Sequence, residues 1–153
     1  MKRLAVAALA ILLLLPVALL ACQKSPEANV PPLNTGTKSV TFEITYDEFL
    51  AAPHATKTID LTYPASLVVM LGSNASTGYQ WGAGPTISDT SVLTQYEHNV
   101  VAATSTAVGA AGKDVWTFKP ASKGTTTVSF GYSRPWEGGE KDEWTLVLTV
   151  VVK

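Results

Sequence analysis

The sequence holds few of the residues that usually form chemical sites. Among its 153 residues there are one cysteine and two histidines. A single cysteine excludes an internal disulfide, and neither His54 nor His98 has another metal ligand at the spacing of a metal site. The chain also lacks a nucleophile elbow, a phosphate-binding glycine loop and a dinucleotide-binding motif. We therefore expect no metal, no cofactor and no enzymatic activity.

An excess of charge of either sign is also missing. The 11 Lys and Arg residues are balanced by 12 Asp and Glu residues, which gives a formal net charge of -1. Binding to nucleic acid depends on a concentrated basic surface. We therefore expect no nucleic-acid partner.

Charges are absent altogether from one long segment near the N-terminus. The basic start Met1-Lys2-Arg3 is followed by Leu4–Ala21, an apolar run with small residues at its end. This is the pattern of a secretory signal. The run is also long enough to cross a bilayer as a helix, so an uncleaved membrane anchor is the alternative. Either interpretation predicts that the chain is targeted to a membrane.

The end of this run resembles the lipobox of bacterial lipoproteins. Its residues are Leu19-Leu20-Ala21-Cys22. In that family the signal is cut before the cysteine, which then carries acyl chains. The resemblance implies a signal peptide over residues 1–21 and lipidation of Cys22. It also implies that the protein is exported and held by its lipid at the cell envelope, on the outer face of a bacterial membrane.

A change of composition follows the cysteine. Residues 22–38 contain Pro26, Pro31, Pro32 and Gly36 but no apolar periodicity, which predicts a flexible tether. The remaining residues, 39–153, are enough to bury a core of their own. We expect them to form a single domain and the protein to be a monomer.

Apolar and polar residues alternate along most of this domain. Period two is the spacing of a strand with one buried face, and the unbroken apolar run at residues 67–71 indicates a strand covered on both faces. The alternating residues are Val40, Phe42, Ile44 and Tyr46; Ile59, Leu61 and Tyr63; Tyr79 and Trp81; Trp116 and Phe118; Val128, Phe130 and Tyr132; and Trp144, Leu146, Leu148, Val150 and Val152. A weaker strand is expected within residues 92–101, and residues 46–52, which end at Pro53, are the one helix candidate.

Short strands separated by glycine and proline define the fold class. About seven or eight of them predict an all-β domain, an immunoglobulin-like antiparallel β-sandwich. Because the chain has one cysteine, this sandwich would have no disulfide. A small β-barrel is the alternative architecture.

A tryptophan stands in the middle of turn residues between the last two strands. Arg134-Pro135-Trp136 is followed by Gly138-Gly139, so Trp136 is expected near a hairpin tip with little core to cover it. Trp and Arg are the residue types most enriched at binding hot spots. The stretch therefore indicates a binding surface. The alternative is that Trp136 covers its own hairpin or a sheet edge.

Two further loops have unusual compositions. Residues 72–81 contain Asn, Ser and Thr, which cap turns, and Gly78, which permits a positive φ. Residues 101–112 carry no charge and few bulky side chains, which suits contact with another protein better than contact with water. Each loop alone is equally consistent with a connection that has no partner.

Together the three loops resemble those of chagasin-like inhibitors of papain-type cysteine peptidases. That family is marked by Asn-Pro-Thr-Thr-Gly-Tyr, Gly-x-Gly-Gly and Arg-Pro-Trp loops, in this order. The corresponding residues here are Asn74, Ala75, Ser76, Thr77, Gly78 and Tyr79; Gly109, Ala110, Ala111 and Gly112; and Arg134, Pro135 and Trp136. The chain departs from the pattern at Ala75, Ser76 and Ala111. The resemblance covers residues 57–153.

The resemblance implies a reversible, non-covalent inhibitor of papain-like cysteine peptidases. Residues 73–79 (the first loop), 103–112 (the second loop) and 133–141 (the third loop) would form a wedge that blocks the active-site cleft. The first loop would lie nearest the catalytic Cys and His, and Trp136 would pack on the enzyme beside the cleft.

Other functions are compatible with the same residues. The main alternative is a lipid-anchored, immunoglobulin-like adhesion or carbohydrate-binding surface module, in which Trp136, Tyr79 and Trp81 form a stacking platform. A structural envelope lipoprotein without a ligand is a further possibility. The smooth Gly and Ala composition of the second loop favours a protein partner.

Overall fold

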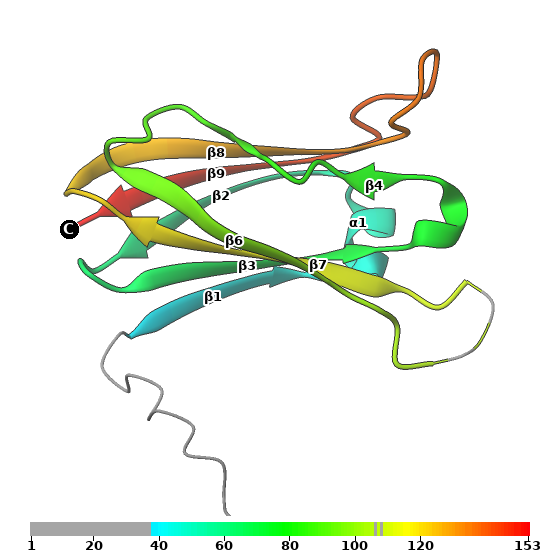
Figure 1. Ribbon diagram of the computed structural model, residues 1–153, viewed down its shortest axis with the longest axis horizontal. Helices are drawn as coiled ribbons and strands as arrows, with labels where there is room; N and C mark the ends of the chain where they lie inside the picture. The colour runs from blue at the N-terminus through cyan, green and yellow to red at the C-terminus, as the bar shows by residue number, and fades with distance from the viewer. Residues whose placement is uncertain (1–37, 106, 108) are drawn as a thin grey trace, which may run out of the picture. The chain divides into compact units, whose positions relative to one another are not determined.

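The computed structural model describes residues 38–105, 107 and 109–153. Within them the chain forms two β-sheets that face each other, with one short helix at one end (Figure 1). The elements are β1 (Ser39–Ile44), α1 (Tyr46–Ala51), β2 (His54–Leu61), β3 (Ser66–Ser73), the 3-10 helix η1 (Ala75–Thr77), β4 (Gln80–Trp81), β5 (Thr86–Ile87), β6 (Leu93–Val101), β7 (Gly112–Pro120), β8 (Gly124–Ser133) and β9 (Trp144–Val152). The predicted export signal, the predicted lipidation site Cys22 and the predicted tether up to residue 37 lie outside the described residues.

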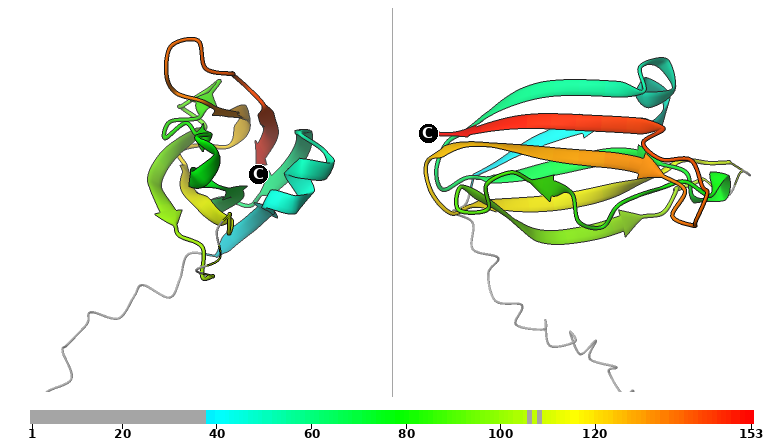
Figure 2. Two further views of the ribbon diagram at one scale, coloured as in Figure 1. Left: turned by 90° about the vertical axis from the view of Figure 1, so that its right-hand side faces the viewer. Right: turned by 90° about the horizontal axis from the view of Figure 1, so that it is seen from above.

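The strand order agrees with a sandwich and not with a small barrel. One sheet has the order β1-β3-β7-β6, and the other has the order β2-β9-β8-β4, with β5 also paired to β8. Figure 2 shows the two layers from the end and from above. The predicted all-β, immunoglobulin-like sandwich is therefore confirmed.

Two details of that prediction are wrong. The described residues form nine strands instead of seven or eight, because β5 was not predicted: its two residues are too few for a periodic pattern. The sheets are mixed and not purely antiparallel, since β1 pairs with β3 and β2 with β9 in parallel. The chain changes sheet between β1 and β2 and again between β2 and β3, so β3 returns to the first sheet in the direction of β1.

The core lies between the sheets, where the predicted alternation places it. In β9 every second residue from Trp144 to Val152 is buried, and the residues between them are half-buried. The largest fully buried side chains come from both sheets and include Trp116, Phe118 and Tyr132. Burying such side chains is worth roughly 1.5–3 kcal/mol each, so the inner faces provide most of the stability.

Helix α1 closes one end of the sandwich, almost over the predicted range. Thr45 and Glu48 form a capping box: Thr45 Oγ1 accepts a bond from Glu48 N, and the Glu48 carboxylate accepts one from Thr45 N. The bond from Thr45 N and a second bond from Thr45 Oγ1 to the same carboxylate hold the pKa of Glu48 below its usual value. The turn into α1 passes so close to β3 that a Cβ on Gly72 would lie 2.1 Å from Tyr46 N. Only glycine fits there.

Aromatic rings fill the core beneath this end. The Trp144 ring stacks on Tyr132 with centroids 4.6 Å apart and on Phe49 of α1 with centroids 5.2 Å apart. Trp81 lies 5.1 Å from Phe49 and 4.9 Å from Tyr132. These four rings therefore support the loops that leave the same end of the sandwich.

Strand register separates the two ends of the domain. Ser39 at the start of β1 pairs with Ser66, and Val152 at the end of β9 pairs with Gly124. Both pairs lie opposite the end where β3 runs out at Ser73 (Figure 1). In the part of the chain that the structure describes, no helix has the length and apolar character needed to cross a bilayer.

Candidate functional site

The register brings the three predicted loops to one end of the sandwich. Ser73 at the end of β3 pairs with Gly112 at the start of β7, so the first and second loops leave neighbouring strands. Gln80 in β4 pairs with Ser133 at the end of β8, so the first and third loops are also neighbours. The first loop therefore lies between the other two.

The first loop is held by its own side chains. Asn74, with 7% of its surface exposed, caps η1: its Oδ1 accepts bonds from Ser76 N at 3.1 Å and Ser76 Oγ at 2.7 Å. Thr77 Oγ1 donates to Asn74 O at 2.7 Å, and Gly78 ends the turn with a φ of 79°. These bonds fix the turn although Ala75 stands where the family has proline.

Asn74 also connects the first loop to the second loop and to the core. Its Nδ2 donates to Gly109 O at 2.9 Å. Its backbone N–H donates to the hydroxyl of Tyr132 at 2.9 Å. Tyr132 is buried, and burial raises the pKa of this hydroxyl. Sequence reasoning placed Tyr132 in a strand but missed this supporting role, for which the alternation carries no signal.

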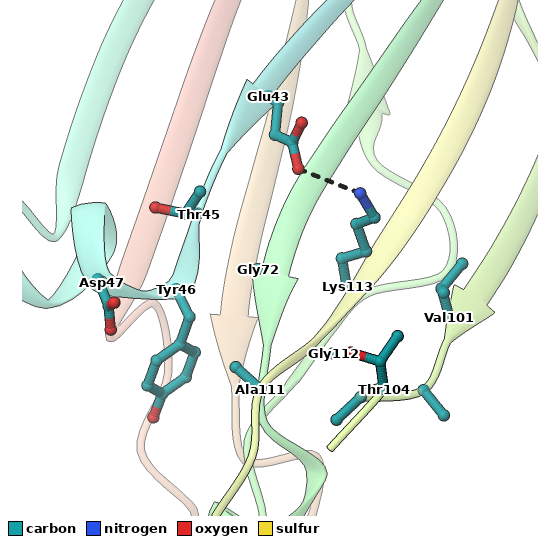
Figure 3. Close-up of a pocket in the computed structure, with 12 residues that line it drawn as sticks. Glu43, Thr45, Tyr46, Asp47, Gly72, Val101, Thr104, Ala111, Gly112 and Lys113 are labelled. Carbon is teal, nitrogen blue, oxygen red and sulfur yellow. Dashed lines mark hydrogen bonds and ion pairs between the residues drawn. The ribbon is translucent and has the colours of Figure 1, made fainter.

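The second loop stands over a hollow at the base of the site. A cavity of about 370 Å³ separates it from the turn that leads into α1. Figure 3 shows Tyr46 and Thr104 on opposite sides of the hollow, with Ala111 between them in this view. It also shows the ion pair between Lys113 and Glu43, whose Nζ and Oε1 atoms are 3.2 Å apart. Among the described non-glycine residues, positive φ occurs at Asp142 alone. Ala111 therefore replaces a family glycine without backbone strain.

The third loop is a hairpin closed by several polar contacts. Arg134 N donates to Glu140 O at 2.8 Å, and Gly139 N donates to Trp136 O at 3.1 Å. Gly138 has a φ of 72°, which the turn requires. The Lys141 ammonium donates to the carbonyl oxygens of Arg134 and Trp136.

Trp136 rests on the first loop and remains half exposed. Its exposed fraction is 51%. A Cβ on Gly78 would lie 2.9 Å from Cη2 of the indole, so the ring is seated against the Gly78 backbone. Trp136 therefore links the third loop to the first and leaves much of its surface to solvent. It is not confined to covering its own hairpin.

A charged and aromatic cluster joins the same two loops. The Arg134 guanidinium lies over the Tyr79 ring, 4.5 Å from its centroid, and NH1 is 3.3 Å from Glu140 Oε2. The Tyr79 hydroxyl donates to the same Glu140 carboxylate. This bond, helped by partial burial, raises the pKa of Tyr79 above its usual value. Glu140 was not among the motif residues, and no sequence pattern would have singled it out.

The thirteen predicted loop residues thus lie at one end of the domain. Trp81 does not join them: it is 3% exposed, and its Nε1 donates to Gly72 O at 3.0 Å inside the sandwich. The proposed sugar platform of Trp136, Tyr79 and Trp81 was wrong, because Trp81 cannot reach a ligand.

The histidines lie elsewhere. His98, on the edge strand β6, has Nε2 2.8 Å from Asp114 Oδ1, and its ring stacks on Trp116. His54 Nδ1 lies 3.0 Å from the hydroxyl of Thr145. Within residues 38–105, 107 and 109–153 there is no group of three or more His, Cys, Asp or Glu side chains placed to hold a metal ion.

Comparison with known proteins agrees with this geometry. The model of the chagasin family of peptidase inhibitors, I42, matches residues 60–150. Amoebiasin-2 of Entamoeba histolytica is 35% identical over 97 residues, which are 63% of this chain and 77% of that protein. The crystal structure of the cysteine protease inhibitor EhICP2 from Entamoeba histolytica matches with a TM-score of 0.58 and 29% identity, over 77% of this chain and 100% of that one.

A second solved structure shares the fold. PbICP-C, solved in complex with falcipain-2, matches with a TM-score of 0.54 over 76% of this chain and 99% of that one, at 16% identity. The family match covers most of the described domain and contains all three loops. The chain therefore belongs to the chagasin family of peptidase inhibitors and is an inhibitor, not an enzyme.

Proposed function

We propose that this protein reversibly and non-covalently inhibits papain-like cysteine peptidases by filling their active-site cleft with its three loops. The observation that supports this proposal most strongly is the central position of the first loop. Asn74 of this loop donates a hydrogen bond to the second loop, and Gly78 packs against Trp136 of the third loop. Relatives support the target class: EhICP2 is a cysteine protease inhibitor, and PbICP-C was solved with falcipain-2.

The geometry suggests how such a wedge would work. The first loop projects between two neighbours that would contact the walls of the cleft while it enters. Because side-chain and backbone bonds already fix its shape, little conformational entropy would be lost on binding. The loops hold no activated nucleophile, so no covalent bond with the enzyme is expected.

Titration of papain tests the proposal directly. Residues 23–153 contain every element that the structure describes, and this protein should abolish papain activity as its concentration approaches that of the enzyme. Trypsin, whose groove differs, should remain active under the same conditions. Equal inhibition of both enzymes, or of neither, would refute the proposed function.

The second loop provides the first mutational prediction. Ala110 is half-buried in this uncharged loop, and Ala110→Asp would place a carboxylate in a surface that loses water on binding. An unpaired buried charge is costly, so the inhibition constant for papain should rise about tenfold or more. Ala121→Asp is the matched control, because Ala121 is exposed beyond β7 at the opposite end. Equal effects of the two substitutions would place the second loop outside the interface.

Export and lipid anchoring are part of the proposal. The first strand of the domain, β1, begins at Ser39, opposite the three loops, so a lipid at Cys22 would attach the domain by the end away from its inhibitory surface. Cys22→Ser should therefore move the protein from the membrane fraction to the soluble fraction without changing its inhibition constant. Fractionation of cells that express each form measures this. If Cys22→Ser still sediments with membranes, an uncleaved helical anchor is the better explanation.

A further inference from the structure

Two adjacent residues on the returning arm of the third loop have opposite charges and contact its functional residues. Glu140 and Lys141 follow Gly138-Gly139 and lie outside the Arg-Pro-Trp motif. Both side chains are solvent-exposed, and that of Glu140 is 61% exposed. Both nevertheless make several polar contacts, which is unusual for charged residues on a loop tip.

Glu140 joins the first and third loops. One carboxylate accepts a bond from the Tyr79 hydroxyl and lies 3.3 Å from NH1 of Arg134. The same guanidinium lies over the Tyr79 ring and 5.7 Å from the centroid of the Trp136 ring. The Glu140 carboxylate thus holds the Tyr79 phenol of the first loop and the Arg134 guanidinium of the third loop next to each other.

Lys141 acts within the third loop. Its ammonium donates to the carbonyl oxygen of Arg134 at 2.5 Å and to that of Trp136 at 3.1 Å. These two carbonyl groups flank Pro135, so the ammonium fixes the backbone on both sides of the motif's proline. The Lys141 ammonium therefore holds residues 134–136, the segment of the third loop that carries Trp136.

The third loop needs such support because the sheet does not provide it. The pairing of β8 with β9 ends at Tyr132 and Trp144, and two glycines lie at the turn. Beyond that pair the hairpin has two backbone hydrogen bonds, from Arg134 N to Glu140 O and from Gly139 N to Trp136 O. A hairpin with so few such bonds samples many conformations, and only a fraction of them would seat the indole on Gly78. If only a fraction of the molecules has the conformation that can bind, the apparent dissociation constant is the intrinsic one divided by that fraction.

We propose that Glu140 and Lys141 are positioning residues that hold Tyr79, Arg134 and Trp136 in the arrangement that binds the peptidase. Neither residue has to touch the enzyme. The inference rests on the proposed function for its effect on inhibition, but the arrangement itself exists in the free protein and is measurable there.

Substitution of Glu140 tests the first half. Glu140→Ala removes both the bond from Tyr79 and the ion pair with Arg134, whereas Glu140→Gln keeps an acceptor for the phenol. We expect the inhibition constant to rise about tenfold for alanine and less for glutamine. Glu97→Gln is the matched control: Glu97 is exposed on β6, away from the three loops, and its side chain makes no hydrogen bond or ion pair with the described residues. It should leave inhibition unchanged.

The rate constants separate positioning from direct contact. Loss of the competent arrangement should lower the association rate constant of Glu140→Ala and leave its dissociation rate constant near that of the wild type. Loss of a direct contact acts mainly on dissociation. A faster dissociation with unchanged association would overturn the positioning role. Equal effects of Glu140→Gln and Glu97→Gln would show that loss of a negative charge anywhere on the domain, and not the position of Glu140, weakens inhibition.

A measurement on the free protein keeps the two proposals distinguishable. The Trp136 ring lies on Gly78, so its ring current should shift the Gly78 α-proton resonances in NMR spectra. These shifts should move toward random-coil values in Glu140→Ala and in Lys141→Met, but not in Glu97→Gln on β6 or in Lys123→Met at the opposite end. Unchanged shifts in both test variants would overturn the inference whether or not papain is inhibited. Shifts that move in a protein that fails to inhibit papain would refute only the proposed function.

A double-mutant cycle tests the contact itself. Tyr79→Phe removes the hydroxyl and keeps the ring under Arg134. If Glu140 acts partly through this hydroxyl, the effects of Tyr79→Phe and Glu140→Ala on the inhibition constant should be less than additive. Full additivity would show that the bond between them does not contribute to binding.

Discussion

Replacement of Trp136 by alanine is expected to raise the inhibition constant for papain roughly thirtyfold. The indole is 51% exposed on a loop tip, next to the loop that would enter the cleft. Anchors of this kind cost about 2 kcal/mol or more when truncated, and about 1.4 kcal/mol corresponds to a tenfold change. Titration against a papain-like enzyme measures the effect.

The melting temperature of the same variant should change little. The Trp136 ring rests on the backbone of Gly78 and does not enter the core between the sheets, so its removal opens no buried cavity. Tyr96→Ala is a suitable control, because Tyr96 is 63% exposed on β6, away from the loops. It should leave inhibition unchanged. Normal inhibition by a Trp136→Ala protein that melts much earlier would show that this residue serves the fold alone.

Periodicity was sufficient for the long strands but not for their arrangement. The alternation in β8 and β9 correctly placed Phe130, Tyr132 and Trp144 inside, because one face of each strand must be buried. It gave no information on the direction of pairing, since parallel and antiparallel strands bury alternate residues equally. The parallel pairing of β1 with β3, and of β2 with β9, therefore could not be predicted from the sequence.

The candidate site was predictable as a set of motifs but not as a connected structure. Loop composition and order located all three segments, but the contacts between them depend on which strands become neighbours in space. The bond from Asn74 to Gly109 spans 35 residues, and that from Tyr79 to Glu140 spans 61. Because the sequence does not show which strands become neighbours, it also gave no sign that Trp81 is buried and cannot belong to an exposed stacking platform. Tyr79 lies just before β4, outside the regular strand, so the two aromatic residues do not share one exposed face.

The support beneath the loops follows from the aromatic core. Tyr132 bonds to Asn74 through its hydroxyl and stacks on Trp144 through its ring. The first loop is therefore built on a residue that is itself held by the sandwich. A change in the core and a change in the loops should consequently have different signatures, one in stability and the other in binding.

Trp144→Ala should lower the free energy of unfolding by about 3–5 kcal/mol, the usual cost of removing a large buried aromatic side chain. Trp144 is 5% exposed and stacks on Tyr132 and Phe49, so truncation leaves a cavity between the sheets. Domains of this size are stable by only about 5–15 kcal/mol, and the loss would remove much of that margin.

Urea unfolding of Trp144→Ala beside Trp144→Phe measures this effect. The midpoint should fall sharply for alanine and much less for phenylalanine, which keeps an aromatic ring between Tyr132 and Phe49. The fraction of Trp144→Ala that remains folded should still inhibit papain more strongly than Trp136→Ala, because its binding loops keep their side chains. A Trp144→Ala protein that unfolds at the wild-type midpoint would contradict the core position of this residue. One that is fully folded but inactive would place Trp144, and not Trp136, at the centre of binding.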